Sequence, residues 1–157
     1  MSNNLLKGKR GIIFGALNDM SIAWKVAERA QEEGATFTLT NAPIAMRMGA
    51  INDLAEKTNS EVIPADATSV EDLKHLFEKS QEILGGKVDF VLHSIGMSPN
   101  VRKKKPYTGL NYEWYKQTLD VSAMSLHKTL QVAYDLDALN NWGSVLALTY
   151  IAAQRIF

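Results

Sequence analysis

The stretch FGALNDMSIA, residues 14–23, joins a short apolar run to a segment with helical periodicity. In α/β proteins that bind dinucleotides, the loop at this place holds the phosphates and usually contains three glycines. Here it contains only Gly15, which suits a tight turn, while the hydroxyl of Ser21 is placed to cap the helix and contact a phosphate. Capping serines are also common in loops without ligands, so this stretch alone leaves phosphate binding and an ordinary turn equally open.

Strand-like and helix-like segments alternate along the whole chain. Five short apolar runs read as strands, at residues 11–14, 36–40, 61–64, 88–93 and 144–150. Helical spacing or helix-end signals fill the intervals, at 21–33 with Gly34 after its end, at 46–58, from a capping box of Thr68 and Glu71 to Gly85-Gly86, and at 111–136. Nearly continuous apolar strands that alternate with helices predict an α/β fold, a doubly wound Rossmann-type parallel sheet covered on both faces.

Composition narrows the class of protein. The 157 residues fit a single domain, 1–157, with 46% hydrophobic and 22% charged residues, typical of a globular protein in water. Seventeen basic residues balance seventeen acidic ones, which argues against nucleic acid and anionic membranes as partners. The chain has no cysteine, so neither disulfides nor a thiolate metal site is expected. With no secretory signal and no membrane-spanning segment, the expected location is the cytoplasm.

Other candidate residues follow the third and fourth strands. In a doubly wound sheet, ligands bind where strands end, near the point at which strand order reverses. Asp66 lies at such an end and can accept a hydrogen bond from an adenine amino group, although capping a turn is its simpler role. Ser94 and Gly96, in the motif HSIG at 93–96, reach the same edge. His93 fits a buried, hydrogen-bonded core histidine better than a catalyst.

These residues carry a resemblance to the bacterial enoyl-[acyl-carrier-protein] reductases, a divergent branch of the short-chain dehydrogenase/reductases. The matching stretches keep the family's order along the chain: GKRGIIFGALNDMSIAW (8–24), EEGATFTLT (32–40), ADAT (65–68), VDFVLHSIGMSP (88–99) and GSVLALTYIAAQR (143–155). In this branch a G-x5-S-I-A loop replaces the glycine-rich fingerprint, and HSIG follows the fourth strand.

The resemblance implies a set of site residues and NAD(H) as the cofactor. Gly15, Ser21 and Ile22 would line the pyrophosphate and ribose; Asp66 and Ala67 would hold the adenine; Ser94, Ile95 and Gly96 would flank the nicotinamide ribose; Met97 and Ser98 would line the substrate pocket. The second strand ends in Thr40-Asn41-Ala42, with Arg47 the only cation nearby in sequence. This favours NADH over NADPH.

The implied reaction reduces a trans-2-enoyl thioester by hydride transfer from NADH to the β-carbon, and an enolate develops on the thioester oxygen. In the family a tyrosine donates to that oxygen, and a lysine six residues later holds the nicotinamide ribose. No Tyr-x6-Lys pair follows the fifth strand before Phe157, so the chain is expected to be truncated at its C-terminus and not fully competent alone. Tyr150 matches another tyrosine of the family's substrate pocket, for a supporting role.

Two alternatives to this enzyme stay open. One is a short-chain dehydrogenase that reduces a carbonyl, against which the G-x5-S-I-A loop argues. The other is a non-catalytic dinucleotide-binding module, which the missing Tyr-x6-Lys pair would produce.

Two further features concern partners. The run Arg102-Lys103-Lys104-Lys105 is a solvated loop or, as a minority hypothesis, a docking patch for the acyl-carrier protein that bears the enoyl substrate. The helix at 111–136 is apolar on two sides, and by resemblance it suggests a homotetramer interface; deep burial is the alternative.

Overall fold

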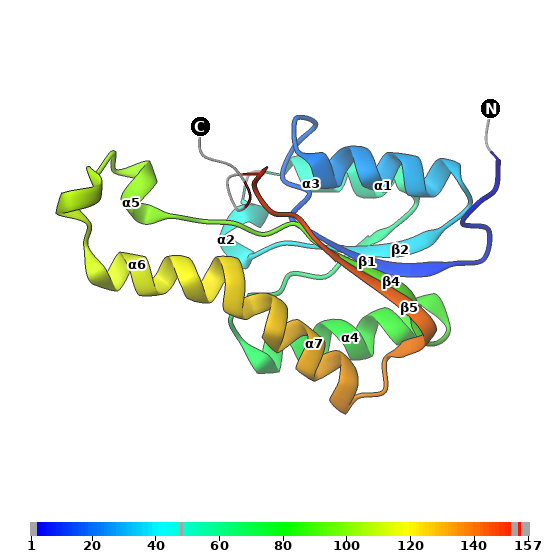
Figure 1. Ribbon diagram of the computed structural model, residues 1–157. Coiled ribbons are helices and arrows are strands. Elements are labelled where there is room, and N and C mark those ends of the chain that lie inside the picture. The colour runs from blue at the N-terminus through cyan, green and yellow to red at the C-terminus, as the bar shows by residue number, and fades with distance from the viewer. Residues whose placement is uncertain (1–2, 48, 152–153, 155–157) are drawn as a thin grey trace.

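The central sheet has five parallel strands in the order β3-β2-β1-β4-β5, in a computed structural model that describes residues 3–47, 49–151 and 154 (Figure 1). The strands are β1 (Arg10–Phe14), β2 (Thr36–Thr40), β3 (Glu61–Val62), β4 (Val88–His93) and β5 (Leu139–Ala147). The helices are α1 (Ile22–Glu32), α2 (Pro43–Met46), α3 (Ala50–Thr58), α4 (Val70–Leu84), α5 (Pro99–Arg102), α6 (Tyr112–Leu119) and α7 (Ser125–Asp135). Strand order reverses between β1 and β4, which confirms the predicted doubly wound sheet.

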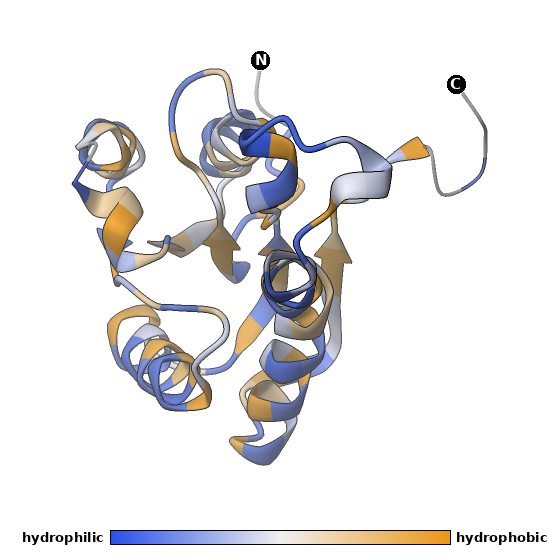
Figure 2. Cartoon of the chain, turned by 90° about the vertical axis from the view of Figure 1, so that its left-hand side faces the viewer, coloured by the Kyte–Doolittle hydropathy of each residue, from blue (hydrophilic) through white to orange (hydrophobic). Residues whose placement is uncertain are grey.

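Helices cover both faces of the inner strands β1 and β4, which are largely buried. The edge strand β5 is mostly exposed, with Leu146 60% exposed, so the prediction of a sheet covered on both faces is wrong for β5. Successive side chains of a strand point to opposite faces, so Ile12 and Phe14 join one core and Ile13 joins the other. The first core packs against α4 and α7, and the second against α1 and α3. Figure 1 shows these two helix pairs on opposite sides of the sheet, and Figure 2 shows the more hydrophobic strand residues between helices of mixed polarity.

The end of α1 follows the sequence prediction. Gly34 has a φ of 90°, and its N–H donates to the carbonyl of Gln31 while the N–H of Ala35 donates to that of Ala30. These two bonds form the Schellman motif that glycine favours after a helix. They turn the chain directly into β2.

Two helix starts differ from the prediction. The segment expected as one helix at 46–58 forms α2 and α3, because the chain breaks at Gly49, whose φ of 74° is incompatible with a continuous right-handed helix. The cap of α4 lies one residue later than predicted: Ser69 Oγ accepts the N–H of Asp72 at 3.2 Å. Thr68 is instead bonded to Asp66.

The helix expected at 111–136 is present, but it contains a π-helical segment at Asp120–Met124 between α6 and α7. Its start is capped by Asn111, whose side chain accepts the N–H of Trp114 at 3.0 Å. The π-helical segment matters for the site because it faces the loop after β4.

The last strand begins earlier and ends earlier than the expected 144–150. Leu139 pairs with Val88, the register then shifts, and Ser144 pairs with Phe90. Trp142, within the irregular stretch, has a φ of 66°. The polar pair Asn140-Asn141 and Gly143 lie within this irregular stretch of β5.

Among the helices of the described residues, none combines the length and hydropathy that crossing a bilayer requires.

Candidate functional site

The candidate site lies at the carboxyl edge of the sheet, which faces α2, α5 and α6 in Figure 1. Backbone hydrogen bonds fasten the loops there to one another: the N–H of Gly15 donates to the carbonyl of Thr40 at 3.1 Å, and that of Ala65 to Asn41 at 3.1 Å. Parallel strands bring their carboxyl ends together, so these loops share one edge although they are distant in sequence.

A cavity of about 720 Å³ opens at this edge, and we call it the edge cavity. Its lining residues come from the loops after β1, β2, β3 and β4, from α2, α5 and α6, and from the π-helical segment: Gly15, Leu17, Asn41, Ala42, Ile44, Ala45, Asp66, Thr68, Ser94, Ile95, Gly96, Met97, Pro99, Arg102, Lys103, Gln117, Asp120 and Val121. Its volume is in the range of small-molecule and cofactor sites.

Gly15 is the point where the loop after β1 meets the loop after β4. Its φ is 84°, and a Cβ at this position would lie 1.9 Å from the carbonyl oxygen of Ser94. Only glycine permits this contact, so the single glycine of the first loop has a clear geometric task.

Ser21 and Ile22 stand at the N-terminus of α1 and are not among the residues that line the edge cavity. Ser21 occupies the N-cap position, but the predicted side-chain cap is wrong: its hydroxyl donates to the carbonyl of Asn18 at 2.6 Å. The first N–H groups of a helix have no partner within the helix. The start of α1 therefore offers donors and the positive end of the helix dipole to an anion.

Asp66 lines the edge cavity, and the structure also gives it the simpler role. Its carboxylate accepts the N–H and the hydroxyl of Thr68, at 2.9 and 2.8 Å. Its own N–H donates to the carboxylate of Asp72 at 2.9 Å. Ala67 beside it is buried and lines a second, smaller cavity. Hydrogen bonds within the chain therefore hold this loop in place without a ligand.

Sequence reasoning missed Thr40, the last residue of β2. Its side chain is fully buried, and its hydroxyl oxygen has no hydrogen-bond partner among the described residues. It lines the smaller cavity, of about 60 Å³, together with Gly15, Asp66 and Ala67. A buried polar group without a partner is costly, so this hydroxyl is suited to a polar group of a bound ligand or to a water molecule. A polar residue at the end of a buried strand was the available signal.

The loop after β4 holds the other predicted residues and is fastened to the π-helical segment. The N–H of Met97 donates to Ser122 Oγ at 3.0 Å, and the Ser122 hydroxyl lies 3.2 Å from the carbonyl oxygen of Met97. Ser94, Ile95, Gly96 and Met97 line the edge cavity. A Cβ at Gly96 would meet no atom within 4 Å, so a larger side chain there has room toward the cavity. Ser98 does not line it but caps α5.

His93 behaves as the predicted core histidine. It is 2% exposed, and its Nε2 lies 2.8 Å from the hydroxyl of Ser125. Burial lowers the pKa of His93 below its ordinary value, which favours the neutral imidazole.

Lys128 was not singled out from the sequence. Its ammonium group donates to Asp120 Oδ1 at 2.7 Å and to the carbonyl of Thr68 at 2.9 Å. It thus joins the π-helical segment to the loop that carries Asp66, and it balances a carboxylate that lines the edge cavity.

Tyr150 lies three residues beyond the end of β5 and is 85% exposed. It is not among the residues that line the edge cavity. Its hydroxyl is therefore not brought together with the other predicted residues in this structure.

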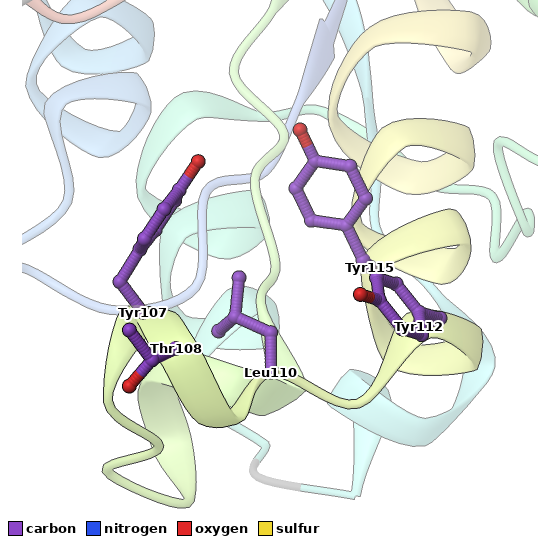
Figure 3. A pocket seen from close by; sticks show the side chains of 5 residues that line it. All are labelled: Tyr107, Thr108, Leu110, Tyr112 and Tyr115. Atoms are coloured by element: carbon purple, nitrogen blue, oxygen red, sulfur yellow. The ribbon is translucent and has the colours of Figure 1, made fainter.

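A separate cavity of about 370 Å³ lies between the turn at Tyr107–Gly109 and the start of α6. Figure 3 shows the tyrosine rings of this tyrosine cavity standing on either side of Leu110. Its lining residues are Tyr107, Thr108, Leu110, Tyr112 and Tyr115, none of which was predicted as a site residue. No group of three or more metal-ligating side chains occurs in the described part of the chain.

Comparison with known proteins identifies the family to which this chain is similar. The model of the family described as Enoyl-(Acyl carrier protein) reductase matches residues 15–157. Enoyl-[acyl-carrier-protein] reductase [NADH] FabI of Rickettsia bellii (strain RML369-C) is 32% identical, with 99% of this chain and 58% of that protein covered. Enoyl-[acyl-carrier-protein] reductase [NADH] 1 of Rhizobium meliloti (strain 1021) is 31% identical, with 99% and 56% covered.

Solved structures agree. The crystal structure of FabI from Alistipes finegoldii is 64% identical, with a TM-score of 0.95, and the match covers 98% of this chain and 59% of that one. The FabI–NADH complex from the same organism also gives 64% identity and a TM-score of 0.95, over 97% of this chain and 54% of that one. The chain spans a little over half the length of the curated relatives it matches. With the family model matching most of its length, the chain belongs to the enoyl-(acyl carrier protein) reductase family.

Proposed function

We propose that this chain, as a single domain over residues 1–157, forms the NAD(H)-binding part of an NADH-dependent enoyl-acyl-carrier-protein reductase of fatty acid synthesis. The observation that supports this most is the edge cavity, where loops from four strands meet around Gly15, Asp66, Ser94 and Gly96. Relatives named as NADH enzymes and a related NADH complex point to the same cofactor.

The residues present fit a dinucleotide. The N-terminus of α1, with Ser21 and Ile22, offers N–H donors to the pyrophosphate beside Gly15. Thr40 has a buried hydroxyl with no hydrogen-bond partner in the described part of the chain, and it lines the smaller cavity with Asp66 and Ala67, where the adenosine would lie. Gly96 leaves open space where a Cβ would otherwise intrude.

The chemistry divides between the cofactor and the chain. When bound, the nicotinamide supplies a hydride to the β-carbon of a trans-2-enoyl thioester. Ser94, Ile95 and Gly96 would orient the nicotinamide ribose, and Met97 and Ser98 would line the substrate side of the site. Tyr150 would support the thioester in the complete enzyme, once its exposed side chain is brought over the site.

Partners and location follow from the same proposal. The substrate would arrive on an acyl-carrier protein, in the cytoplasm. The π-helical segment and α7 keep large apolar side chains on their surface, with Met124 49%, Leu130 40% and Tyr134 84% exposed. Such a face fits a homotetramer interface better than the alternative of deep burial. Sedimentation of the protein and of Leu130→Glu tests this: a tetramer that the charge dissociates is expected, and a monomer in both cases contradicts it.

A binding titration tests the cofactor assignment. Purified chain is titrated with NADH, and the fluorescence of the nicotinamide is followed. Gly96→Val is expected to weaken binding at least about tenfold by filling the cavity, because its side chain meets open space. The matched control is Thr36→Val, an exposed position at the opposite edge of the sheet, which should bind as the wild type does. Absence of NADH binding, or equal binding by Gly96→Val, contradicts the proposal.

A second measurement separates the reductase from a non-catalytic dinucleotide-binding module and from a carbonyl reductase. The chain is extended with the C-terminal part of Alistipes finegoldii FabI, to which it is 64% identical over the shared length. The expected result is NADH oxidation with a crotonyl thioester. NADH oxidation only with a ketone supports the carbonyl reductase, and no oxidation with either supports the binding module.

A further inference from the structure

The basic run 102–105 is divided by the fold. Arg102 ends α5 and Lys103 follows it, and both line the edge cavity. All four side chains are exposed, but Lys104 and Lys105 do not line the edge cavity. The four cations are equivalent in the sequence, whereas the structure places two of them in the lining of the edge cavity, which Ala42 and Ala45 after β2 also line.

The backbone that carries these two cations is held in place. Asn100 is 3% exposed, and its side chain donates to the carbonyl of Asn111 and accepts the N–H of Asn111, both at 3.0 Å. Ser98 caps the same short helix, and the N–H groups of Arg102 and Lys103 bond back to residues 98 and 99. The two cations therefore extend from a fixed turn rather than from a free loop.

Arg102 and Lys103 have no carboxylate partner among the described residues. Two carboxylates also line the edge cavity, and each has a partner: Asp120 bonds to Lys128, and Asp66 accepts from Thr68. Within the described ranges, neither Arg102 nor Lys103 forms an ion pair. The lining of the edge cavity thus holds two cations that form no ion pair within the described residues, together with the Asp66 carboxylate, which is hydrogen-bonded to the neutral Thr68.

The segment after β2 contributes no acidic residue to the edge cavity, and Asp66, from the loop after β3, is the nearby carboxylate in its lining. Where NAD-specific doubly wound folds place an acidic residue for the ribose hydroxyls, this chain has Asn41 and Ala42 after β2. Arginine and lysine are the residues that bind phosphate esters most strongly, arginine with two parallel N–H donors.

We propose that Arg102 and Lys103 form a phosphate-binding subsite at the mouth of the edge cavity, for a phosphate ester on a ligand whose other end lies at the carboxyl edge. Two ligands carry such a group: the 2′-phosphate of NADPH, and the phosphopantetheine arm of the thioester substrate. The inference rests on the proposed function for the identity of these ligands, and it extends the site beyond NADH.

Calorimetric titration of two ligand pairs tests the subsite. The pairs are 2′,5′-ADP against 5′-ADP, and S-crotonyl-4′-phosphopantetheine against S-crotonylpantetheine. The wild type is expected to bind the member with the additional phosphate roughly tenfold more tightly in one pair, as one or two charge-assisted hydrogen bonds provide. The pair that shows the difference identifies the source of the phosphate.

Two double variants with the same change of charge show whether the effect belongs to Arg102 and Lys103 or to the basic run as a whole. Arg102→Gln/Lys103→Gln should abolish the difference, while Lys104→Gln/Lys105→Gln should retain most of it. An equal effect of both variants, or no difference in the wild type for either pair, overturns the subsite. NADH binding without a phosphate difference refutes this inference alone, and a phosphate difference without NADH binding refutes the cofactor assignment alone.

Discussion

Replacing Gly15 with alanine should cost the protein both stability and NADH binding, for a reason that can be worked from the structure. The new Cβ would lie 1.9 Å from the carbonyl oxygen of Ser94, far inside van der Waals contact, and the neighbour is backbone rather than a flexible side chain. The φ of 84° adds the penalty of a left-handed conformation, about 1–2 kcal/mol for an L-residue. Overpacking in a tight site typically adds about 1–3 kcal/mol.

The expected loss is therefore about 2–5 kcal/mol of unfolding free energy. With a urea m-value of about 1–3 kcal/mol/M, the midpoint should fall by on the order of 1–2 M. Urea unfolding of wild type and Gly15→Ala, followed by far-UV circular dichroism, measures this shift. NADH titration below the transition then reports whether the displaced loop still binds.

Gly96→Ala is the matched control, because its Cβ meets nothing within 4 Å. Its unfolding free energy should be unchanged, or higher by the ~0.4–1 kcal/mol that alanine gains over glycine through the unfolded chain. A midpoint for Gly15→Ala equal to that of wild type would refute the reasoning, since the two loops could not then be in the contact described.

Three further substitutions test separate contacts. Burial favours the neutral form of His93, so its pKa in the folded protein lies below the unfolded value near 6.5. The free energy of unfolding should fall as the pH drops below that value. The urea midpoints at pH 7.5 and pH 5.5 should therefore differ less for His93→Gln than for the wild type. Hydrogen bonds from Lys57 and then Lys25 lower the pKa of Glu28 to about 2, so the ionised Glu28 stabilises the fold above pH 4.5 and this stabilisation is lost as the pH falls toward the folded pKa. In acid unfolding, Glu28→Gln should therefore lose stability less steeply than the wild type between these pH values. Equal profiles for the two proteins would count against the contact. Lys128→Met should lower the unfolding free energy by about 1 kcal/mol in urea titration, and no change would mean that its two bonds are not formed in solution.

Much of the fold could be predicted because its signals are local. The apolar run of β1, the helical spacing of α1 and the glycine after α1 each depend only on neighbouring residues. All three features were predicted correctly. The errors arose where one residue satisfies two patterns. Thr68 and Ser69 both suit an N-cap, and the Asp66 carboxylate decides between them by binding Thr68.

The prediction that the last strand begins at residue 144 was wrong for another reason. Asn140, Asn141 and Gly143 have the composition of a turn, yet they lie inside a strand because Leu139 before them and Ser144 after them both pair with β4. Only the neighbouring strand supplies the hydrogen bonds that outweigh the local preference. Strand pairing is a long-range property that a single sequence does not display.

The candidate site shows the same division. Gly15, Asp66, Ser94 and Gly96 could be placed at one edge because each lies within four residues of the end of a strand. Arg102 and Lys103 could not, since their approach to the edge cavity depends on how Asn100 docks α5 against the start of α6. Tyr150 lies beyond the end of β5, and the motif match alone gave no information on its exposure.

The most direct test of the central claim is a map of where NADH contacts the chain. Backbone amide chemical shifts of isotopically labelled protein are recorded with increasing NADH. The account predicts saturable changes at Gly15, Ile22, Asp66 and Gly96, with the tyrosine cavity unaffected. Changes confined to the tyrosine cavity, or no saturable change anywhere, would contradict the claim that this chain binds a dinucleotide at the carboxyl edge of its sheet.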